Sequence, residues 1–296
     1  MKCLLIYNPC AGGKHAKKQL PDVEAALIKR SIEFDLLLTD YPEHATELVK
    51  EADFKKYDGL IAAGGDGTLF EVINGYYKNP SKKKIPIGIL PVGTGNAFAR
   101  DLSLETKDWE RAIDIIAAGQ VRKVDVGQFV SHGQTYYFLN ILGLGFVSDV
   151  TVFASKLKWL GNIVYTLGVF WEMLRLKATP VRIEVDGQTR DEDVIFIEMS
   201  NTTYTANFLM APNAKIDDGK LDVTICKKLS RRRLIQAFPK IFTGEHILMD
   251  EIDSIQASDI QIHSETPKVL TPDGEIIGIT PVKVNCLHQA IEVFWQ

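Results

Sequence analysis

The sequence LIAAGGDGT at residues 60–68 is a short apolar run that ends in a glycine-rich loop. The run Leu60–Ala63 has the length and composition of a buried strand. Its glycines allow backbone N–H groups to approach an anion without a Cβ in the way. The residues that follow, Thr68–Tyr77, predict a helix whose amino end adds partial positive charge. The pattern suits phosphate binding, although such a loop alone is more often a structural turn.

Strand and helix patterns alternate on both sides of this loop. Further strands are predicted at Cys3–Tyr7, Phe34–Leu38 and Ile87–Leu90, and helices at Lys17–Arg30, Glu43–Ala52, Asn96–Leu102 and Asp108–Ala118. Continuous apolar strands that alternate with helices are typical of a parallel sheet covered on both faces. We therefore expect an α/β nucleotide-binding domain over residues 1–124.

Two more glycine-rich loops follow predicted strands. Residues 8–14 read NPCAGGK, and residues 91–96 read PVGTGN. Ligands of parallel α/β sheets bind beyond the carboxyl ends of the strands, so the three loops are expected to meet at one crevice. Such a crevice suits a nucleoside triphosphate, although the sequence contains no Walker A pattern GxxxxGK[ST]. Asp66 is a candidate to hold magnesium or to orient the phosphates.

Strand-like runs dominate after Val124. They lie at residues 136–142, 181–185, 194–199, 221–226, 260–263, 282–287 and 291–295, and Asp-Gly turns separate several of them. Two helical patterns interrupt the strands, at Ser155–Leu176 and Arg231–Phe242. We predict a second, mainly antiparallel β-sandwich domain over residues 125–296.

Length and charge narrow the class of protein. A chain of 296 residues has room for two domains. A net charge of -4 gives no bulk attraction for nucleic acid. The four cysteines are scattered and the first apolar run is too short for a signal peptide, so we expect a cytoplasmic protein. The uncharged part of residues 157–176 is too short for a membrane-spanning helix.

The order of the motifs resembles the diacylglycerol kinase catalytic family, which includes sphingosine and ceramide kinases and many bacterial lipid kinases. NPxxGG at residues 8–13, GGDGT at 64–68 and GTGNAFAR at 93–100 carry the resemblance in the first half. APNAKIDDGKLD at 211–222 and TPDGE at 271–275 carry it in the second half. NAD kinases and phosphofructokinases share the GGDG loop on a similar domain, but GTGNAFAR is typical of the lipid kinases.

The resemblance implies where ATP and magnesium bind. ATP is expected at Asn8, Gly12, Thr39, Gly64, Gly65, Asp66, Gly67, Thr68, Leu69, Phe70, Glu71, Thr94 and Asn96. A catalytic Mg²⁺ is expected at the phosphates, with Asp66 as its contributor. A structural Mg²⁺ is implied at the Asp218 carboxylate and the backbone carbonyls of Lys215 and Lys220, since oxygen ligands from a tight turn suit this cation. From the residues alone, Asp-Asp-Gly is more often a solvated turn.

The resemblance also makes Asp273 the general base, with Glu275 in support. Phosphoryl transfer needs a carboxylate within reach of the acceptor hydroxyl, besides positioning and charge neutralisation. Without the resemblance, Pro272-Asp273-Gly274 reads as a β-turn. Two positions depart from the family pattern: Phe70 stands where GGDGTxNE has Asn, and Ala97 where GNDFAR has Asp. These changes raise the alternatives of altered nucleotide preference or weaker ATP binding.

A lipid acceptor requires contact with a membrane surface. Candidates are Lys156–Lys177, which combines aromatic residues with basic ends, and Arg231-Arg232-Arg233. A helix packed on the sandwich explains the first segment equally well. A homodimer is compatible with the edge strands expected in the second domain.

The sequence thus predicts an ATP-dependent lipid kinase, with diacylglycerol as the default acceptor and phosphatidic acid as the product. One alternative is a kinase for another lipid alcohol, such as a sphingoid base. Another is a nucleotide- or lipid-binding regulator with little turnover, which Phe70 keeps open. GTGNAFAR and the late DGE argue against an NAD kinase.

Overall fold

The chain forms two compact units. The computed structural model describes residues 1–105, 107–156, 177–205 and 208–296. Unit 1 contains residues 1–126 and 288–296, and unit 2 contains residues 127–287. Unit 1 is discontinuous in sequence, because residues 288–296 pack with residues 1–126. The predicted division of the protein into domains at residue 124 stays a prediction.

Unit 1 is built on a parallel sheet with the strand order β4-β3-β1-β2. Its strands are β1 (Lys2–Tyr7), β2 (Glu33–Leu38), β3 (Gly59–Gly64) and β4 (Ile87–Pro91). Every residue of β3 and β4 is buried, as expected for strands covered on both faces. Beside β4, Val293 of β14 (Val282–Phe294) pairs in parallel with Ile87. The predicted parallel α/β architecture is confirmed.

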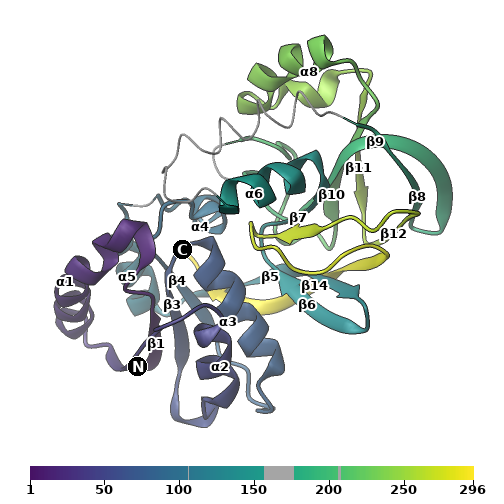
Figure 1. The fold of residues 1–296 in the computed structure, drawn as a ribbon. Helices are drawn as coiled ribbons and strands as arrows, with labels where there is room; N and C mark the ends of the chain where they lie inside the picture. Colours follow the sequence, from purple (N-terminus) through teal and green to yellow (C-terminus); the bar gives the residue numbers. More distant parts are fainter. Residues whose placement is uncertain (106, 157–176, 206–207) are drawn as a thin grey trace. The chain divides into compact units, whose positions relative to one another are not determined.

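Helices cover both faces of this sheet. They are α1 (His15–Lys29), α2 (His44–Glu51), α3 (Asp66–Lys78), α4 (Ala97–Asp101) and α5 (Trp109–Ala118), with short 3-10 turns η1 (Ala11–Lys14) and η2 (Phe54–Lys56). Figure 1 shows α1 and α5 on one face and α2 and α3 on the other. Helices α2 and α3 pack backbone to backbone, because a Cβ on Gly75 would lie 2.6 Å from the Thr46 carbonyl oxygen.

Unit 2 consists mainly of antiparallel strands. These are β5 (Val121–Ser131, shared with unit 1), β6 (Gln134–Phe138), β7 (Ile141–Gly145), β8 (Thr179–Val185), β9 (Gln188–Ser200), β10 (Leu221–Lys227), β11 (Ile252–Ala257), β12 (Asp259–Ser264) and β13 (Leu270–Pro272). Strands β11, β10, β9, β8 and β12 follow one another in a sheet, and β7 pairs with β9 and β13. The predicted antiparallel character is confirmed.

The helical segments among the described residues of unit 2 are short. They are α6 (Phe146–Lys156), α8 (Arg231–Ala237), η4 (Phe238–Phe242) and η5 (Glu245–Leu248). The predicted helix Arg231–Phe242 is therefore α8 followed by the 3-10 turn η4. Most of the predicted helix Ser155–Leu176 lies outside the described residues. Within the part of the chain that is described, no helix has the length and apolar character needed to cross a membrane.

Two predicted strand patterns were wrong in detail. Residues 136–142 were expected as one strand, but β6 ends at Phe138 and β7 begins at Ile141. The backbone between them turns because its N–H groups donate to a distant carboxylate, described below. At the other end of the chain, two predicted strands form the single strand β14. Within β14, the backbone N–H of Gln289 donates a hydrogen bond to the Asp125 carboxylate at 2.6 Å.

Candidate active site

The loop after β1 is tied to β3 and to the start of α3. The N–H of Asn8 donates to the Ala63 carbonyl at 2.9 Å. Its Nδ2 donates to Thr68 Oγ1 at 2.9 Å, and its Oδ1 accepts the N–H of Cys10 at 2.9 Å. Asn8 therefore joins two of the three glycine-rich loops through both ends of its side chain.

The loop after β4 touches the other two loops at glycine positions. The N–H of Gly93 donates to the Gly64 carbonyl at 2.9 Å. A Cβ on Gly93 would lie 2.3 Å from the Gly65 Cα, which excludes any side chain there. In the loop after β1, a Cβ on Gly12 would lie 2.9 Å from the Val92 carbonyl oxygen, and Gly12 has a left-handed φ of 58°. The three loops meet at the end of the sheet where β1, β3 and β4 end.

Asp66 begins α3 and faces the loop after β4. Its Oδ1 accepts the N–H of Ala97 at 2.8 Å, and a Cβ on Gly95 would lie 2.5 Å from its Oδ2. Nearby, Asn96 has a left-handed φ of 48° and donates from Nδ2 to the Gly93 carbonyl at 2.8 Å. Thr94 is exposed. A carboxylate and a phosphate repel each other, so this arrangement suits an intervening divalent cation.

Four predicted ATP residues have mainly structural contacts. Thr39 is buried at the end of β2, and its N–H donates to the Tyr7 carbonyl at 3.0 Å. Leu69 and Phe70 are each 4% exposed on the buried side of α3. The Glu71 carboxylate reaches the amino end of α2, where it accepts two backbone N–H groups, as described next.

Glu71 acts as a cap for α2. Its Oε1 accepts the N–H of Glu43 at 2.9 Å and its Oε2 accepts the N–H of Ala45 at 3.0 Å. The Glu71 carbonyl accepts Thr46 Oγ1–H at 2.9 Å. No side chain within α2 itself caps this helix end. A carboxylate there satisfies helix donors and faces the positive end of the helix dipole.

Asp273 lies in the turn after β13 and is 8% exposed. Its Oδ1 accepts the N–H groups of Asn140 and Ile141, each at 2.9 Å, and its Oδ2 accepts that of Leu139 at 3.1 Å. Its own N–H donates to the Ile141 carbonyl at 3.0 Å, and its φ is 46°. Three charge-assisted bonds hold the carboxylate firmly and shape the turn between β6 and β7.

Glu275 lies beside Asp273 in the same turn. Its side chain is exposed, and its N–H donates to the Pro272 carbonyl at 2.7 Å. On the other side of Asp273, Thr271 Oγ1 lies 2.8 Å from Ser148 Oγ, so the turn is also fastened to the start of α6. The structure thus holds Asp273 rigidly and leaves Glu275 at the surface.

The sequence Asp217-Asp218-Gly219 forms a turn just before β10. Asp218 Oδ1 accepts the N–H of Lys220 at 3.0 Å. Burial raises the pKa of the neighbouring Asp222, and the negative charge of Asp218 adds to this rise. The Asp218 carboxylate and the carbonyls of the turn are oxygen donors, which suit a hard cation such as Mg²⁺. Among the described residues, no three His, Cys, Asp or Glu side chains are grouped to hold a metal, so a cation here depends on backbone carbonyls, such as those of Lys215 and Lys220.

Sequence reasoning missed the buried carboxyl group of Glu198. Glu198 is 1% exposed on β9, and burial raises its pKa to about 7. Its Oε1 accepts hydrogen bonds from Thr205 Oγ1 at 2.6 Å and from Ser200 Oγ at 3.3 Å. The available signal was a single charged residue within the otherwise apolar run 194–199.

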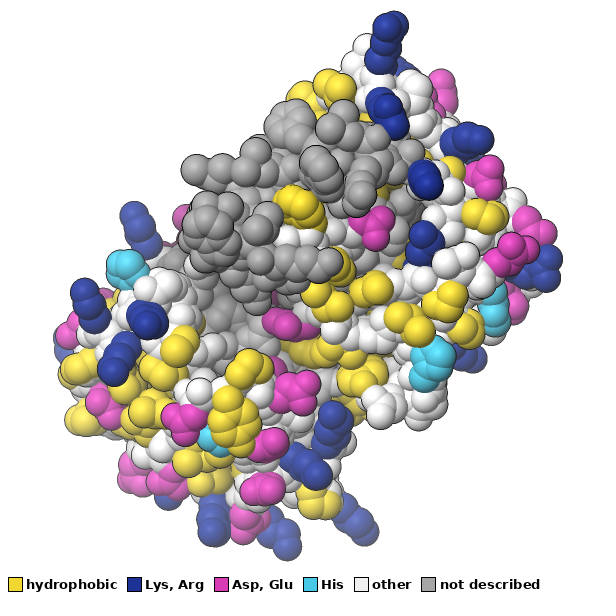
Figure 2. Space-filling view, in the orientation of Figure 1, with side chains coloured by type: hydrophobic (Ala, Val, Ile, Leu, Met, Phe, Trp, Pro, Cys, Tyr) yellow, Lys and Arg dark blue, Asp and Glu magenta, His cyan; other side chains and the backbone are white. Residues whose placement is uncertain are grey.

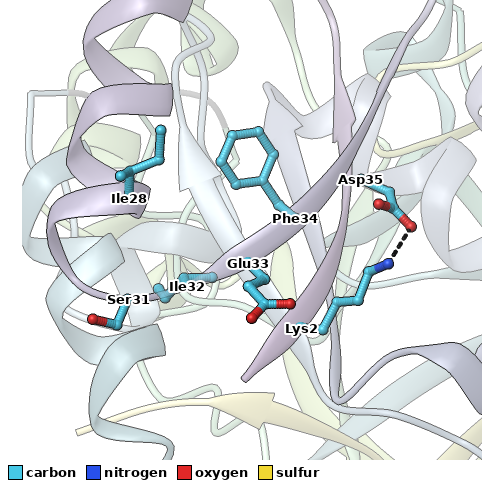
Figure 3. Close-up of a pocket in the computed structure, with 7 residues that line it drawn as sticks. All are labelled: Lys2, Ile28, Ser31, Ile32, Glu33, Phe34 and Asp35. Atoms are coloured by element: carbon cyan, nitrogen blue, oxygen red, sulfur yellow. Dashed lines mark ion pairs between the residues drawn. The ribbon is translucent and has the colours of Figure 1, made fainter.

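A hollow of about 500 Å³ lies at the opposite end of the unit 1 sheet (Figure 3). It is lined by Lys2, Ile28, Ser31, Ile32, Glu33, Phe34 and Asp35. Lys2 and Asp35 form an ion pair of 2.9 Å on its wall. Because Lys2 and Glu33 begin their strands, this hollow lies away from the strand ends where parallel sheets bind ligands. We therefore do not expect the nucleotide in this hollow.

The parallel α/β unit carries three converging glycine-rich loops, which are typical of proteins that bind nucleotide phosphates, and the other unit is mainly antiparallel. Residues 2–129 match the family model of the diacylglycerol kinase catalytic domain. Residues 140–295 match that of the YegS C-terminal NAD kinase beta sandwich-like domain. The chain belongs to the diacylglycerol kinase catalytic-domain family.

Similar proteins span nearly the same length. A diacylglycerol kinase of Bacillus subtilis is 34% identical over 292 residues, which cover 98% of this chain and 94% of the relative. One of Staphylococcus saprophyticus is 36% identical over 293 residues, with the same coverage. The crystal structure of a putative diacylglycerol kinase from Bacillus anthracis matches with a TM-score of 0.82 at 31% identity, over 100% of this chain and 97% of that one. The predicted family, fold class and kinase activity are confirmed.

Proposed function

We propose that this protein transfers the γ-phosphate of ATP to the hydroxyl of diacylglycerol and so forms phosphatidic acid. One observation carries the proposal: the loops after β1, β3 and β4 meet at backbone contact distance, with Gly93 packed on Gly65. Such a cradle of glycines and helix amino ends suits the phosphates of a nucleotide. The curated relatives named diacylglycerol kinase support diacylglycerol as the acceptor.

ATP is proposed to bind at the residues predicted from the sequence, with its phosphates at Gly64–Thr68, Asn8 and Asn96. The backbone N–H groups at the start of α3 would donate hydrogen bonds to the phosphates. The Asp66 carboxylate would bind the cation that accompanies them. Phe70 is buried in unit 1 rather than displayed at the loop. This burial argues against Phe70 as an obstacle to the nucleotide, and therefore against a regulator without turnover.

Asp273 is proposed as the general base. As the acceptor oxygen attacks the γ-phosphorus, the bond to the β–γ bridging oxygen of ATP breaks and the hydroxyl proton passes to the Asp273 carboxylate. Three N–H donors fix the position of this carboxylate, which is the positioning that phosphoryl transfer depends on. Glu275, exposed in the same turn, is proposed as a supporting carboxylate.

Magnesium is proposed at two places. Asp66 would hold the ion that neutralises the ATP phosphates. Asp218, with the carbonyls of Lys215 and Lys220, would hold a structural ion that stabilises the turn before β10. We also propose that the protein works in the cytoplasm in peripheral contact with a membrane. A homodimer that pairs through edge strands of unit 2 is a further proposal.

The test is transfer of label from γ-labelled ATP, with magnesium, into lipids in mixed micelles. The panel contains diacylglycerol, monoacylglycerol, a ceramide and a sphingoid base, with NAD as a soluble control. Labelled phosphatidic acid is the expected product. Label in the sphingoid base alone would assign the other lipid alcohol, and label in none of them, from folded protein that binds ATP, would overturn the proposal.

A further inference from the structure

Three large apolar side chains stand out from the helical segment 231–248 of unit 2. Leu248 is 79% exposed, Ile235 57% and Phe242 50%. They come from η5, α8 and η4, respectively, so three successive helical turns each display one apolar residue. The same turns bury Leu234, Ala237 and His246, and Met249 directly after η5 is buried as well. The segment therefore buries part of its apolar side chains and leaves three large ones exposed, which is unusual for a surface facing only water.

The exposed Phe242 ring is held in place by other rings. Phe242 lies 5.1 Å from Phe208 and 5.8 Å from Phe238 between ring centroids, in edge-to-face geometry. Phe208 and Phe238 are 6.1 Å apart, which closes a three-ring cluster. A half-exposed ring that is fixed in this way keeps its apolar surface directed outward.

Basic side chains accompany the apolar ones. Residues 231–250 contain Arg231, Arg232, Arg233 and Lys240 against two acidic residues, in a chain whose net charge is -4. Arg233 pairs with Glu251 at 2.7 Å, while Arg231 and Arg232 are exposed at the start of α8. Figure 2 shows dark blue Lys and Arg side chains gathered over the part of the molecule that Figure 1 labels α8. The exposed residues of this segment thus combine apolar side chains with local positive charge.

We propose that this surface, made by Arg231, Arg232, Ile235, Phe242 and Leu248, docks the protein on an anionic lipid bilayer. The inference rests on the proposed function, in which the acceptor is a membrane lipid. Apolar residues with arginines beside them are suited to the boundary between acyl chains and anionic headgroups. A bilayer also accepts protruding side chains without a matching pocket, whereas a protein partner requires shape complementarity.

Buried side chains connect this segment to the turn that carries the proposed base. Leu234 of α8 packs with Val150 of α6 in one buried cluster, together with Phe146 and Phe238. Helix α6 follows β7 directly, and its Ser148 is fastened to Thr271, two residues before Asp273. Docking by α8 would therefore bring the acceptor-handling part of unit 2 to the lipid layer as one body.

The experiment compares the full-length protein with two sets of variants. The first replaces Ile235, Phe242 and Leu248 by Ser, with Ile28→Ser plus Leu38→Ser as the matched control at exposed apolar positions of unit 1. The second is Arg231→Gln plus Arg232→Gln, with the exposed pair Lys55→Gln plus Lys56→Gln as control. Each protein is sedimented with phosphatidylcholine vesicles, with and without phosphatidylglycerol. If the triple variant fails to fold, Leu248→Ser alone takes its place.

We expect the triple variant to bind vesicles about tenfold less tightly or worse, since three insertable side chains are removed. The arginine variant should lose only the extra binding that phosphatidylglycerol confers, and both controls should bind like the parent. The triple variant should phosphorylate a monomeric short-chain diacylglycerol at the parental rate. Vesicle binding by the triple variant equal to the parent's, or no vesicle binding by the parent, would overturn the docking proposal. A parent that binds vesicles but phosphorylates no lipid would instead overturn the proposed function.

Discussion

A Cβ on Gly93 would come within 2.3 Å of the Gly65 Cα, so the loops after β4 and β3 are in backbone contact. A Cβ on Gly65 would meet less steric conflict, because it would lie 3.4 Å from the Gly93 Cα. Gly65 was predicted to bind ATP and Gly93 to belong to a loop at the same crevice, yet only Gly93 lacks room for a methyl group. This asymmetry provides a matched pair of substitutions in one contact.

Gly93→Ala should lower the free energy of unfolding by about 3 kcal/mol, because the backbones must move apart. It should also abolish ATP binding, since the cradle opens. Gly65 has a φ of -107°, which alanine also adopts. Gly65→Ala should therefore change the free energy of unfolding by less than about 1 kcal/mol. Urea unfolding and ATP calorimetry on both variants check this. Equal stability of the two variants would show that the contact does not constrain the loops.

Glu71→Ala should lower the free energy of unfolding by about 1–2 kcal/mol, because the N–H groups of Glu43 and Ala45 lose their acceptor. Glu51→Ala, at the opposite end of the same helix, is the control and should cost nothing measurable. Thermal unfolding measures both. The ATP dissociation constant of Glu71→Gln, which keeps one acceptor oxygen, tests separately whether Glu71 also contacts the nucleotide.

Asp273→Asn should lower the rate of phosphoryl transfer about a thousandfold, as expected for loss of a general base, and leave ATP affinity unchanged. Asp273→Ala should also lose stability, since the three buried N–H groups of residues 139–141 lose an acceptor at about 1–3 kcal/mol each. Single-turnover rates and ATP calorimetry separate these effects. Glu275→Gln should reduce the rate much less, and a parental rate in Asp273→Asn would remove Asp273 as the base.

Glu198→Gln should alter the pH dependence of stability. Burial raises the pKa of Glu198 from 4.5 to about 7, so between these values the folded protein keeps a proton that the unfolded chain has released. The free energy of unfolding therefore falls as pH rises through this window and stays lower above it, by up to about 3 kcal/mol. The variant should match the parent at pH 4 and exceed it at pH 8 in urea unfolding. Glu192→Gln, on the same strand, should show no such pH-dependent difference from the parent.

The parallel sheet could be read from the sequence because its strands are buried on both faces and therefore continuously apolar. Glycine-rich loops marked where β1, β3 and β4 end, and the rule for ligands of parallel sheets brought the loops together. The break between β6 and β7 could not be read in this way. It exists because the N–H groups of Leu139–Ile141 donate hydrogen bonds to Asp273, which is more than 130 residues away in the sequence.

The candidate site was predictable only where a motif carried it. The family resemblance identified Asp273 and Asp218 as site residues. Without it, the local sequence predicts only ordinary turns at both positions. Nothing in the sequence indicated that Glu71 caps α2, because that role depends on how α2 packs on α3. Glu198 was hidden for a similar reason, since a lone carboxyl group in an apolar strand gives no hint of the Thr205 hydroxyl that meets it.

The return of residues 288–296 to unit 1 has a consequence for synthesis on the ribosome. The Phe294 ring lies against Gly59 of β3, where a Cβ would come within 2.8 Å of it, and it also borders Gly88 of β4. About 160 residues of unit 2 are made between the two parts of unit 1. At about 5–20 residues per second, the nascent sheet waits roughly ten to thirty seconds for this ring. Until then the edge of β4 is open to pairing with other nascent chains, so chaperone binding should be strongest in that interval.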